Sequence, residues 1–186
     1  MDTKSRVDKA GLTNGVRTQR SGFLIRDALS GELDEVSLLI RDAYVEYQNS
    51  FPPERWKLYL EDIVDVRSRL AVSELIVAEL DRQLVGTVTL YLEASSYLHQ
   101  QCPQGWAAVR LLAVRPAYRG QGIGRALMEE CVRRCRVKDI RTIALHTAVI
   151  MSAARKMYED MGFVRAPQYD FQPAPGTVVM AYSLQL

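Results

Sequence analysis

Three glycines stand at alternate positions in the segment VRPAYRGQGIGRALMEECVRRC, namely Gly120, Gly122 and Gly124, and an arginine flanks them on each side, Arg119 and Arg125. A long helical pattern follows, although glycine weakens helices. A strand that passes through glycines into a helix leaves free backbone N–H groups at the helix N-terminus, which bind anions with the help of the helix dipole. Arginine side chains add charge that suits phosphate oxygens. The segment therefore predicts a pyrophosphate site.

The spacing of the glycines narrows the choice of ligand. G-x-G-x-G differs from the G-x-G-x-x-G of dinucleotide-binding folds, and the absence of Gly-Lys-Ser/Thr argues against a nucleoside-triphosphate loop. On spacing alone, a glycine-rich turn that only joins a strand to a helix explains the pattern about equally well.

Two motifs resemble the GCN5-related N-acetyltransferase (GNAT) family. The segment LLAVRPAYRGQGIGRALM is similar to its acyl-CoA-binding motif Q/R-x-x-G-x-G/A, which Arg119, Gly122 and Gly124 match. The segment AARKMYEDMGF, Ala153–Phe163, resembles the tyrosine-bearing helix of the family and ends in the same Gly-Phe. Both motifs occur in the order and at the separation typical of the family, and the order of strands and helices agrees from about Phe23 onward.

The resemblance implies an acyltransferase that moves the acetyl group of acetyl-CoA directly to a primary amine of a small molecule or a protein. In the family, a strand pairs through its backbone with the pantetheine arm, and the glycine loop holds the pyrophosphate. The implied cofactor-binding residues are Leu112, Ala113, Val114, Arg119, Gly120, Gln121, Gly122, Ile123, Gly124 and Arg125. A backbone N–H near Leu112 or Ala113 is expected to polarise the thioester oxygen.

Tyr158, in the second motif, is the expected general acid. A phenol has a reference pKa of about 10, which is close enough to that of a thiol to protonate the leaving thiolate. The alternative is that Tyr158 only packs, since it lies four residues after Ala154 on an apolar helix face.

The general base is less well defined, because many relatives carry a glutamate on the strand that matches Trp106–Val114, where this chain has only Arg110 as a charged residue. An alkylamine with a pKa of about 10.4 must lose a proton before it attacks. The candidates are Glu93 at the end of the preceding strand, His99 in the following loop, or water relayed by Tyr44 or Tyr47. His146 is interpreted as a strand residue packed beside the core.

Loops around the expected cavity supply candidates for the acceptor site. In relatives, the loops equivalent to NSFPPERW and YDFQPAPG frame the acceptor, although ordinary surface loops are nearly as good an interpretation. The candidate substrate-binding residues are Phe51, Trp56, Asp170 and Phe171. Met151 stands where many relatives have an asparagine that contacts the pantetheine arm.

Two other functions remain open at this point. The first is a non-catalytic acyl-CoA-binding module, favoured by the missing strand glutamate and disfavoured by Tyr158. The second is transfer of an acyl group longer than acetyl.

Composition limits the class of protein. The 186 residues are 48% hydrophobic and 25% charged, typical of one globular domain. We expect a flexible tail at residues 1–21 and a single domain at 22–186. The net charge of +2 indicates neither nucleic-acid nor membrane binding. Three cysteines and no apolar leader favour the cytoplasm, and Cys131 and Cys135 lack the further ligands of a metal site. The resemblance also allows a homodimer.

The expected fold is α/β, with a mixed, mostly antiparallel central sheet flanked by helices and a splayed strand pair that holds the acyl-CoA. Strands are expected at 23–26, on both sides of a turn at 81–83, and at 106–114, 141–147, 163–171 and 177–186. Helices are expected at about 32–47, from Pro52 to Leu70, and from Ser152 to a stop at Gly162. Another helix is expected after the glycine segment, with an apolar stripe of Ile123, Leu127, Cys131 and Cys135.

Overall fold

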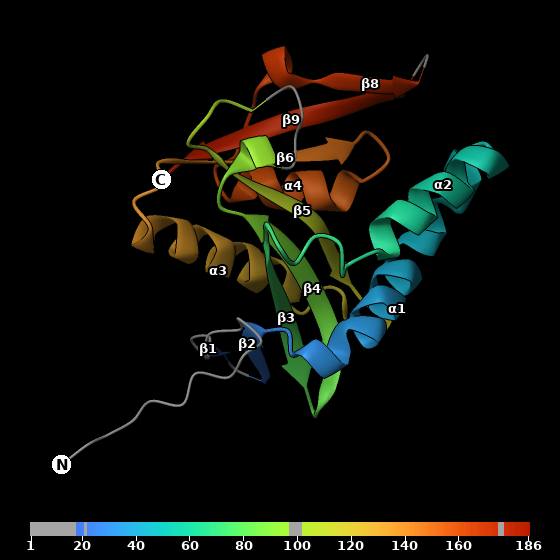
Figure 1. The fold of residues 1–186 in the computed structure, drawn as a ribbon, viewed down its shortest axis with the longest axis vertical. Helices are drawn as coiled ribbons and strands as arrows, with labels where there is room; N and C mark the ends of the chain where they lie inside the picture. Colours follow the sequence, from blue (N-terminus) through green and yellow to red (C-terminus); the bar gives the residue numbers. More distant parts are fainter. Residues whose placement is uncertain (1–17, 21, 97–101, 175–176) are drawn as a thin grey trace.

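The computed structural model describes residues 18–20, 22–96, 102–174 and 177–186, and their strands form one nine-stranded sheet in the order β1-β2-β3-β4-β5-β6-β9-β7, with β8 on β9 (Figure 1). The strands are β1 Thr18–Arg20, β2 Phe23–Asp27, β3 Glu74–Leu80, β4 Gln83–Tyr91, β5 Ala107–Val114, β6 Thr142–Ala148, β7 Val164–Arg165, β8 Phe171–Ala174 and β9 Thr177–Gln185. The α-helices are α1 Leu33–Tyr44, α2 Pro53–Val64, α3 Ile123–Val137 and α4 Ser152–Asp160.

One pair of neighbouring strands, β5 and β6, is parallel, and the other pairs in the described sheet are antiparallel. The parallel pairing runs from Ala107↔Ile143 to Val109↔Leu145 and goes no further, although both strands continue. The two strands therefore diverge beyond these residues. The predicted mixed, mostly antiparallel sheet with a splayed strand pair is confirmed.

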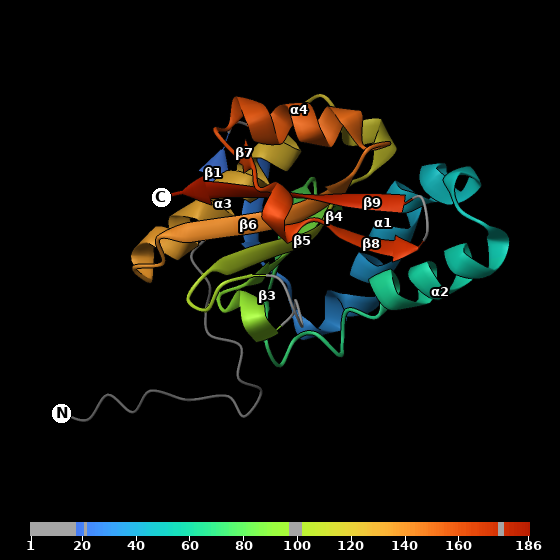
Figure 2. The ribbon, with the colours of Figure 1, turned by 90° about the horizontal axis from the view of Figure 1, so that it is seen from above.

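Helices cover both faces of the sheet (Figures 1 and 2). Buried residues of α1 and α2 form one core cluster against β3, β4 and β5, while α3, together with Tyr158 of α4, packs on the opposite face. The apolar stripe predicted for α3 is buried, with Leu127, Cys131 and Cys135 each 0% exposed. A pair of helices thus covers each face of the sheet. Because both faces of the central strands are buried, their sequences are nearly continuous apolar runs.

A β-bulge interrupts β5 just beyond the point where β6 diverges. Thr89 pairs with Arg110 and Thr87 pairs with Ala113, so two residues of β5 oppose one residue of β4. Leu111, inside the bulge, has a φ of 54°. Because a bulge shifts the alternation of side chains by one residue, Arg110 and Leu111 both lie on the α1–α2 face, where Arg110 pairs with Asp62 and Leu111 joins the core.

Two local predictions are confirmed. The hairpin between β3 and β4 turns at Asp81 and Arg82, whose φ values of 48° and 65° are those of a turn that matches the twist of the strands. Helix α4 ends next to Gly162, where the N–H of Phe163 donates to the carbonyl of Tyr158 over 3.0 Å.

Several boundaries differ from the expected ones. The chain enters the sheet already at β1, inside the segment expected to be a tail. Residues 45–50 form a 3-10 helix in place of the last turn of α1. Helix α2 ends at Val64, not near Leu70, because the Arg69 guanidinium donates to the carbonyls of Asp62 and Ile63 at the end of the helix. The strand expected at 163–171 is divided into β7 and β8 by a 3-10 turn that begins at Pro167.

Within the described parts of the chain, no helix has the length and apolar character needed to cross a membrane.

We expect Gly122→Ala to lower the free energy of unfolding by about 1–2 kcal/mol, because alanine disfavours the left-handed backbone that Gly122 adopts. Urea denaturation measures this loss. Gly124→Ala is the matched control: Gly124 has no left-handed backbone, and an added Cβ would meet the Met157 sulfur at 3.5 Å, an ordinary contact. Its unfolding free energy should change by less than about 0.5 kcal/mol. Equal losses in the two variants would show that the left-handed backbone of Gly122 is not the cause.

Candidate active site

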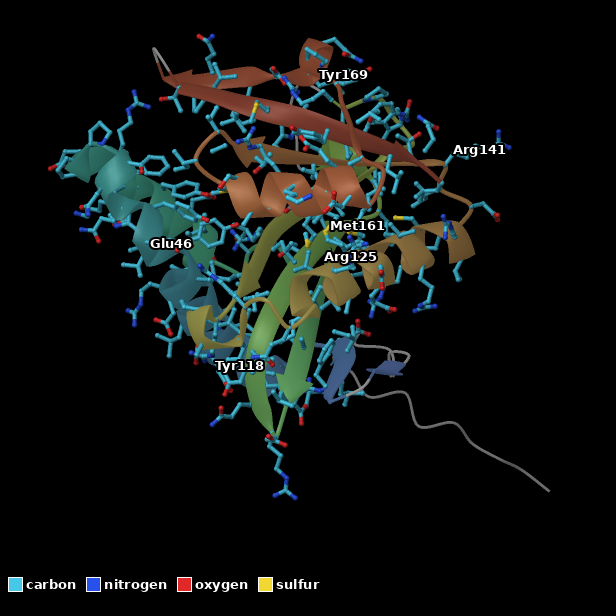
Figure 3. The ribbon with its side chains drawn as sticks, turned by 180° about the vertical axis from the view of Figure 1, so that it is seen from behind. Glu46, Tyr118, Arg125, Arg141, Met161 and Tyr169 are labelled. Atoms are coloured by element: carbon cyan, nitrogen blue, oxygen red, sulfur yellow. The ribbon has the colours of Figure 1, made fainter. Side chains whose placement is uncertain are left out.

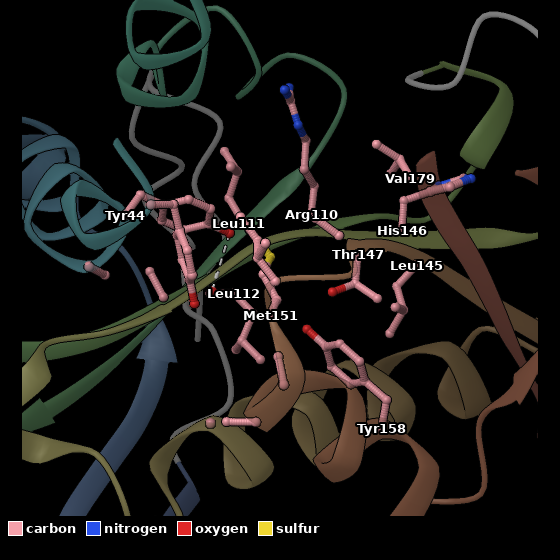
Figure 4. Close-up of a pocket in the computed structure, with 18 of the residues that line it drawn as sticks. Tyr44, Arg110, Leu111, Leu112, Leu145, His146, Thr147, Met151, Tyr158 and Val179 are labelled. Carbon is pink, nitrogen blue, oxygen red and sulfur yellow. Dashed lines mark hydrogen bonds between the residues drawn. The ribbon is translucent and has the colours of Figure 1, made fainter. Parts of the chain in front are cut away.

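A cavity of about 1240 Å³ opens where β5 and β6 diverge. Its walls are the outer halves of these two strands, the end of α1 with the segment leading into α2, the start of α3, and α4 (Figure 4). The β8–β9 hairpin closes one side through Phe171 and Val179. The predicted glycine loop and the predicted catalytic tyrosine therefore meet at one cavity.

The glycine loop has the geometry of an anion site. Gly120 and Gly122 have φ values of 76° and 79°, and Gly122 is the N-cap of α3, with its carbonyl accepting the N–H of Ala126. The N–H groups of the first turn, at residues 123–125, have no partner within the helix, and no side chain caps them. Arg125 lines the cavity near this turn (Figure 3) and has no ion pair with a described residue. These donors fit a pyrophosphate.

Arg119 lines the cavity, but its guanidinium is hydrogen-bonded to other residues of the protein. Its Nη1 donates to a carboxylate oxygen of Glu46 at 2.9 Å, its Nη2 to the carbonyl of Ala43 at 3.0 Å, and its Nε to the carbonyl of Val114 at 3.2 Å. The hydrogen bond to Glu46 raises the pKa of Arg119, which stays charged. Arg119 thus connects the loop before α3 to the end of α1, and Arg125, which has no ion pair with a described residue, is the freer of the two charges.

The outer half of β5 faces the cavity with Leu112, Ala113 and Val114, three of the residues expected to bind the cofactor. Beyond Val109, the backbone groups of β5 that point toward β6 have no partner among the described strands, so an extended chain can pair with them. The Tyr44 hydroxyl lies 3.4 Å from the carbonyl of Leu112 and donates to it (Figure 4). Burial raises the pKa of Tyr44, so this phenol remains a donor at neutral pH.

Tyr158 projects from α4 toward the diverging strands (Figure 4). Its side chain is 6% exposed, and its ring packs against Phe163 with 5.9 Å between centroids. Its hydroxyl forms no hydrogen bond with a described residue. Burial raises the pKa of the phenol well above its usual range, so Tyr158 holds its proton at neutral pH. The side chain both packs and reaches the cavity, so the two interpretations of Tyr158 are compatible.

His146 lines the same cavity from β6, one residue beyond the last pairing with β5. Its Nε2 lies 2.9 Å from the carbonyl of Tyr169. A carbonyl only accepts hydrogen bonds, so Nε2 carries the proton and Nδ1 has a free lone pair in the neutral ring. Burial lowers the pKa of His146, which keeps the ring neutral. The expectation that His146 only packs beside the core is therefore incomplete.

The charges that line the cavity are all basic. Among the described lining residues there is no aspartate or glutamate, and the charged ones are Arg55, Arg110, Arg119 and Arg125. On the side of the cavity near α2, Arg55 donates to the carbonyl of Pro173 at 3.0 Å and Arg110 pairs with Asp62. A ligand with several positive charges would meet repulsion with no carboxylate to offset it.

Four predicted site residues do not line the cavity. The carboxylate of Glu93 accepts the N–H of Ser95 at 3.3 Å and that of Gly105 at 3.4 Å, because Glu93 closes the loop after β4. Trp56 is buried, and its ring packs on that of Phe51 with 5.8 Å between centroids. The carboxylate of Asp170 pairs with the Arg165 guanidinium at an N–O distance of 2.7 Å. Gln121 is an exposed residue of the glycine loop. His99 lies outside the described residues.

The remaining candidates do reach the cavity. Phe51, Phe171, Tyr47 and Met151 line it, and Ile123 does so from the start of α3. Sequence reasoning missed His146 and Thr147 as cavity residues. The available signal was their position at the end of the strand RTIALHT, because polar residues there lie beyond a parallel pairing. In the described parts of the chain, no cluster of three or more histidine, cysteine, aspartate or glutamate residues could hold a metal ion.

Comparison with known proteins gives one family. The model of the Acetyltransferase (GNAT) family matches residues 36–163, which is more than half of the chain. N-alpha-acetyltransferase 30 of Mus musculus is 27% identical over 174 residues, covering 89% of this chain and 44% of the mouse protein. The Saccharomyces cerevisiae protein of the same name is 40% identical over 57 residues, which are 31% of this chain and 32% of the yeast protein. The chain thus spans less than half the length of these curated relatives.

The fold is also shared with a solved structure, the PaiA N-acetyltransferase of Thermoplasma acidophilum in complex with coenzyme A. The two superpose with a TM-score of 0.66 at 18% identity, over 86% of this chain and 97% of the other. That likeness shows the fold, and the family match covers the segment from α1 to the end of α4, with both predicted motifs. The chain therefore belongs to the GNAT family of acetyltransferases.

Proposed function

We propose that this protein transfers the acetyl group of acetyl-CoA to the α-amine at the N-terminus of a peptide or protein. The single observation that carries the choice of acceptor is the absence of carboxylates among the described residues that line the cavity. Enzymes that take polyamines or other polycationic acceptors need acidic groups to pair the extra charges. An N-terminal residue brings one amine on an otherwise uncharged backbone.

The acid–base chemistry of the cavity supports the same acceptor. An α-amine has a pKa of about 7.7–8.0, so roughly one molecule in ten is neutral at pH 7, whereas a lysine amine of pKa about 10.4 is neutral in roughly one molecule in a few thousand. His146 is a modest base, because burial lowers its pKa. A weak base is sufficient for an α-amine and is poorly matched to a lysine side chain.

The names of the relatives agree with this proposal. Two of the matched proteins are N-alpha-acetyltransferases, and the residues 36–163 that match the family include both strands of the cavity. The aromatic rings of Phe51 and Phe171 would contact the side chain of the first residue of the peptide.

Each residue then has a defined role. Acetyl-CoA, when bound, supplies the acetyl group as a thioester. The free N–H groups at residues 123–125 and the guanidinium of Arg125 hold the pyrophosphate, and backbone groups of β5 near the bulge at Leu111 orient and polarise the thioester carbonyl. Nδ1 of His146 accepts a proton from the amine, and the Tyr158 hydroxyl donates one to the leaving sulfur.

Three acceptors test the choice of amine: a lysine-free peptide with a free N-terminus, an N-acetylated peptide with one internal lysine, and spermidine. We expect kcat/KM for the free N-terminus to exceed that for the lysine peptide by roughly a hundredfold at pH 7, following the neutral fractions of the two amines. Release of coenzyme A thiol measures the rate.

A higher kcat/KM for spermidine or lysine would contradict the proposed acceptor. Binding of acetyl-CoA without thiol release for any amine would instead favour a non-catalytic acyl-CoA-binding module. If coenzyme A thiol is released faster from an acyl-CoA with a longer chain than from acetyl-CoA, the protein transfers that longer acyl group.

His146→Gln tests the proposed base. In the unmodified protein, kcat/KM should follow the neutral fraction of the amine as pH falls to about 6.5 and show an additional acidic decline at lower pH, because His146 must also be neutral and its pKa is lowered. The variant should lose about a hundredfold in kcat/KM at pH 7 and also lose this acidic decline. Persistence of the same decline in the variant would assign it to another group.

Tyr158→Phe tests the proposed acid. We expect kcat to fall by about a hundredfold, while the affinity for coenzyme A, measured by calorimetry, falls by no more than about threefold because the ring still packs on Phe163. An unaltered kcat would remove Tyr158 from the mechanism.

A further inference from the structure

Thr147 carries a buried hydroxyl that no described residue satisfies. The residue is 3% exposed, and its Oγ1 has no hydrogen-bond partner in the described parts of the chain. An unsatisfied buried hydroxyl is unfavourable, and valine has the same shape without that penalty. The hydroxyl therefore needs an explanation, and the position of Thr147 on the wall of the cavity gives one.

The Thr147 side chain lies on the same face of β6 as Leu145, two residues earlier. Leu145 belongs to the core cluster that contains Tyr158, so this face of β6 is turned toward α4. Figure 4 shows the hydroxyl groups of Thr147 and Tyr158 pointing into the same part of the cavity, next to the gap between β5 and β6. Neither hydroxyl has a hydrogen-bond partner among the described residues, and the two are not hydrogen-bonded to each other in this structure.

The proposed chemistry leaves Tyr158 in need of a donor. A phenol that gives its proton to a departing thiolate becomes a phenolate, and a buried phenolate without a hydrogen-bond donor is costly. Burial already favours the neutral phenol at Tyr158. A hydroxyl placed beside it lowers this cost by donating to the phenolate oxygen.

We propose that Thr147 is a positioning residue that acts through Tyr158: when acetyl-CoA occupies the cavity, the Thr147 hydroxyl donates to the Tyr158 oxygen, orients the phenol toward the leaving sulfur and stabilises the phenolate. The inference rests on the proposed function. No bond to Thr147 is made or broken. The Tyr158 proton passes to the sulfur, the phenolate recovers a proton from water, and Thr147 keeps its own.

The test compares Thr147→Val, which removes the hydroxyl at constant shape, with Thr147→Ser, which retains it. We expect kcat to fall about tenfold in the valine variant, with KM for acetyl-CoA unchanged, and to stay within about threefold of the unmodified protein in the serine variant. The thermal midpoint of the valine variant should be unchanged or higher, since an unsatisfied hydroxyl has been removed. A kcat unaffected by Thr147→Val would overturn the proposal.

A double variant separates action through Tyr158 from an independent effect. If Thr147 acts through the phenol, adding Thr147→Val to Tyr158→Phe should lower kcat no further. A further tenfold loss in the double variant would show that Thr147 acts by itself and would overturn the assignment.

Ligand binding gives a readout that needs no turnover. Calorimetry with coenzyme A and with desulfo-coenzyme A should show that Thr147→Val weakens only the sulfur-containing ligand, by about threefold, because Tyr158 is then less well oriented toward the sulfur. Equal weakening of both ligands would indicate a general packing defect and overturn the proposal. If the unmodified protein binds neither ligand, the proposed function fails, and that result is distinct from either outcome for Thr147.

Discussion

The divergence of two parallel strands is the constraint on which the rest of this structure depends. β5 and β6 pair through Val109↔Leu145 and then separate while each remains extended. Backbone N–H and C=O groups need partners, so the open edges along the separated halves form a surface that an extended ligand can complete. The cavity, the start of α3 and Tyr158 all lie around this opening, and their placement follows from it.

The open strands keep their shape because other elements hold them from outside. β5 remains paired with β4 on its other edge, apart from the bulge at Leu111, and Tyr44 donates to the carbonyl of Leu112. Arg119 fixes the glycine loop to Ala43 at the end of α1 and to Glu46 in the 3-10 helix that follows. α1 therefore supports both the bulge and the loop, so residues far apart in sequence maintain one preorganised site.

Electrostatics distinguishes the two ends of the cavity. Arg125 at the glycine loop, where a polyanion fits, has no ion pair with a described residue, whereas Arg110 at the α2 side is paired with Asp62. Burial keeps His146 neutral and Tyr158 protonated, the states that a base and an acid must have before a proton transfer. The proposed roles thus depend on desolvation by the same core that stabilises the sheet.

The sequence by itself determined the order of elements, the glycine loop and the tyrosine helix, because hydrophobic periodicity and glycine conformation are local properties. It could not determine which polar residues meet at the cavity. Glu93 was a reasonable candidate on its strand and closes a loop instead, whereas His146 and Thr147 reach the cavity only because β6 separates from β5. That separation arises from pairing between strands that are distant in the sequence. The same is true of the bulge that sets the side-chain register of Arg110 and Leu111, so only the tertiary structure decided both features.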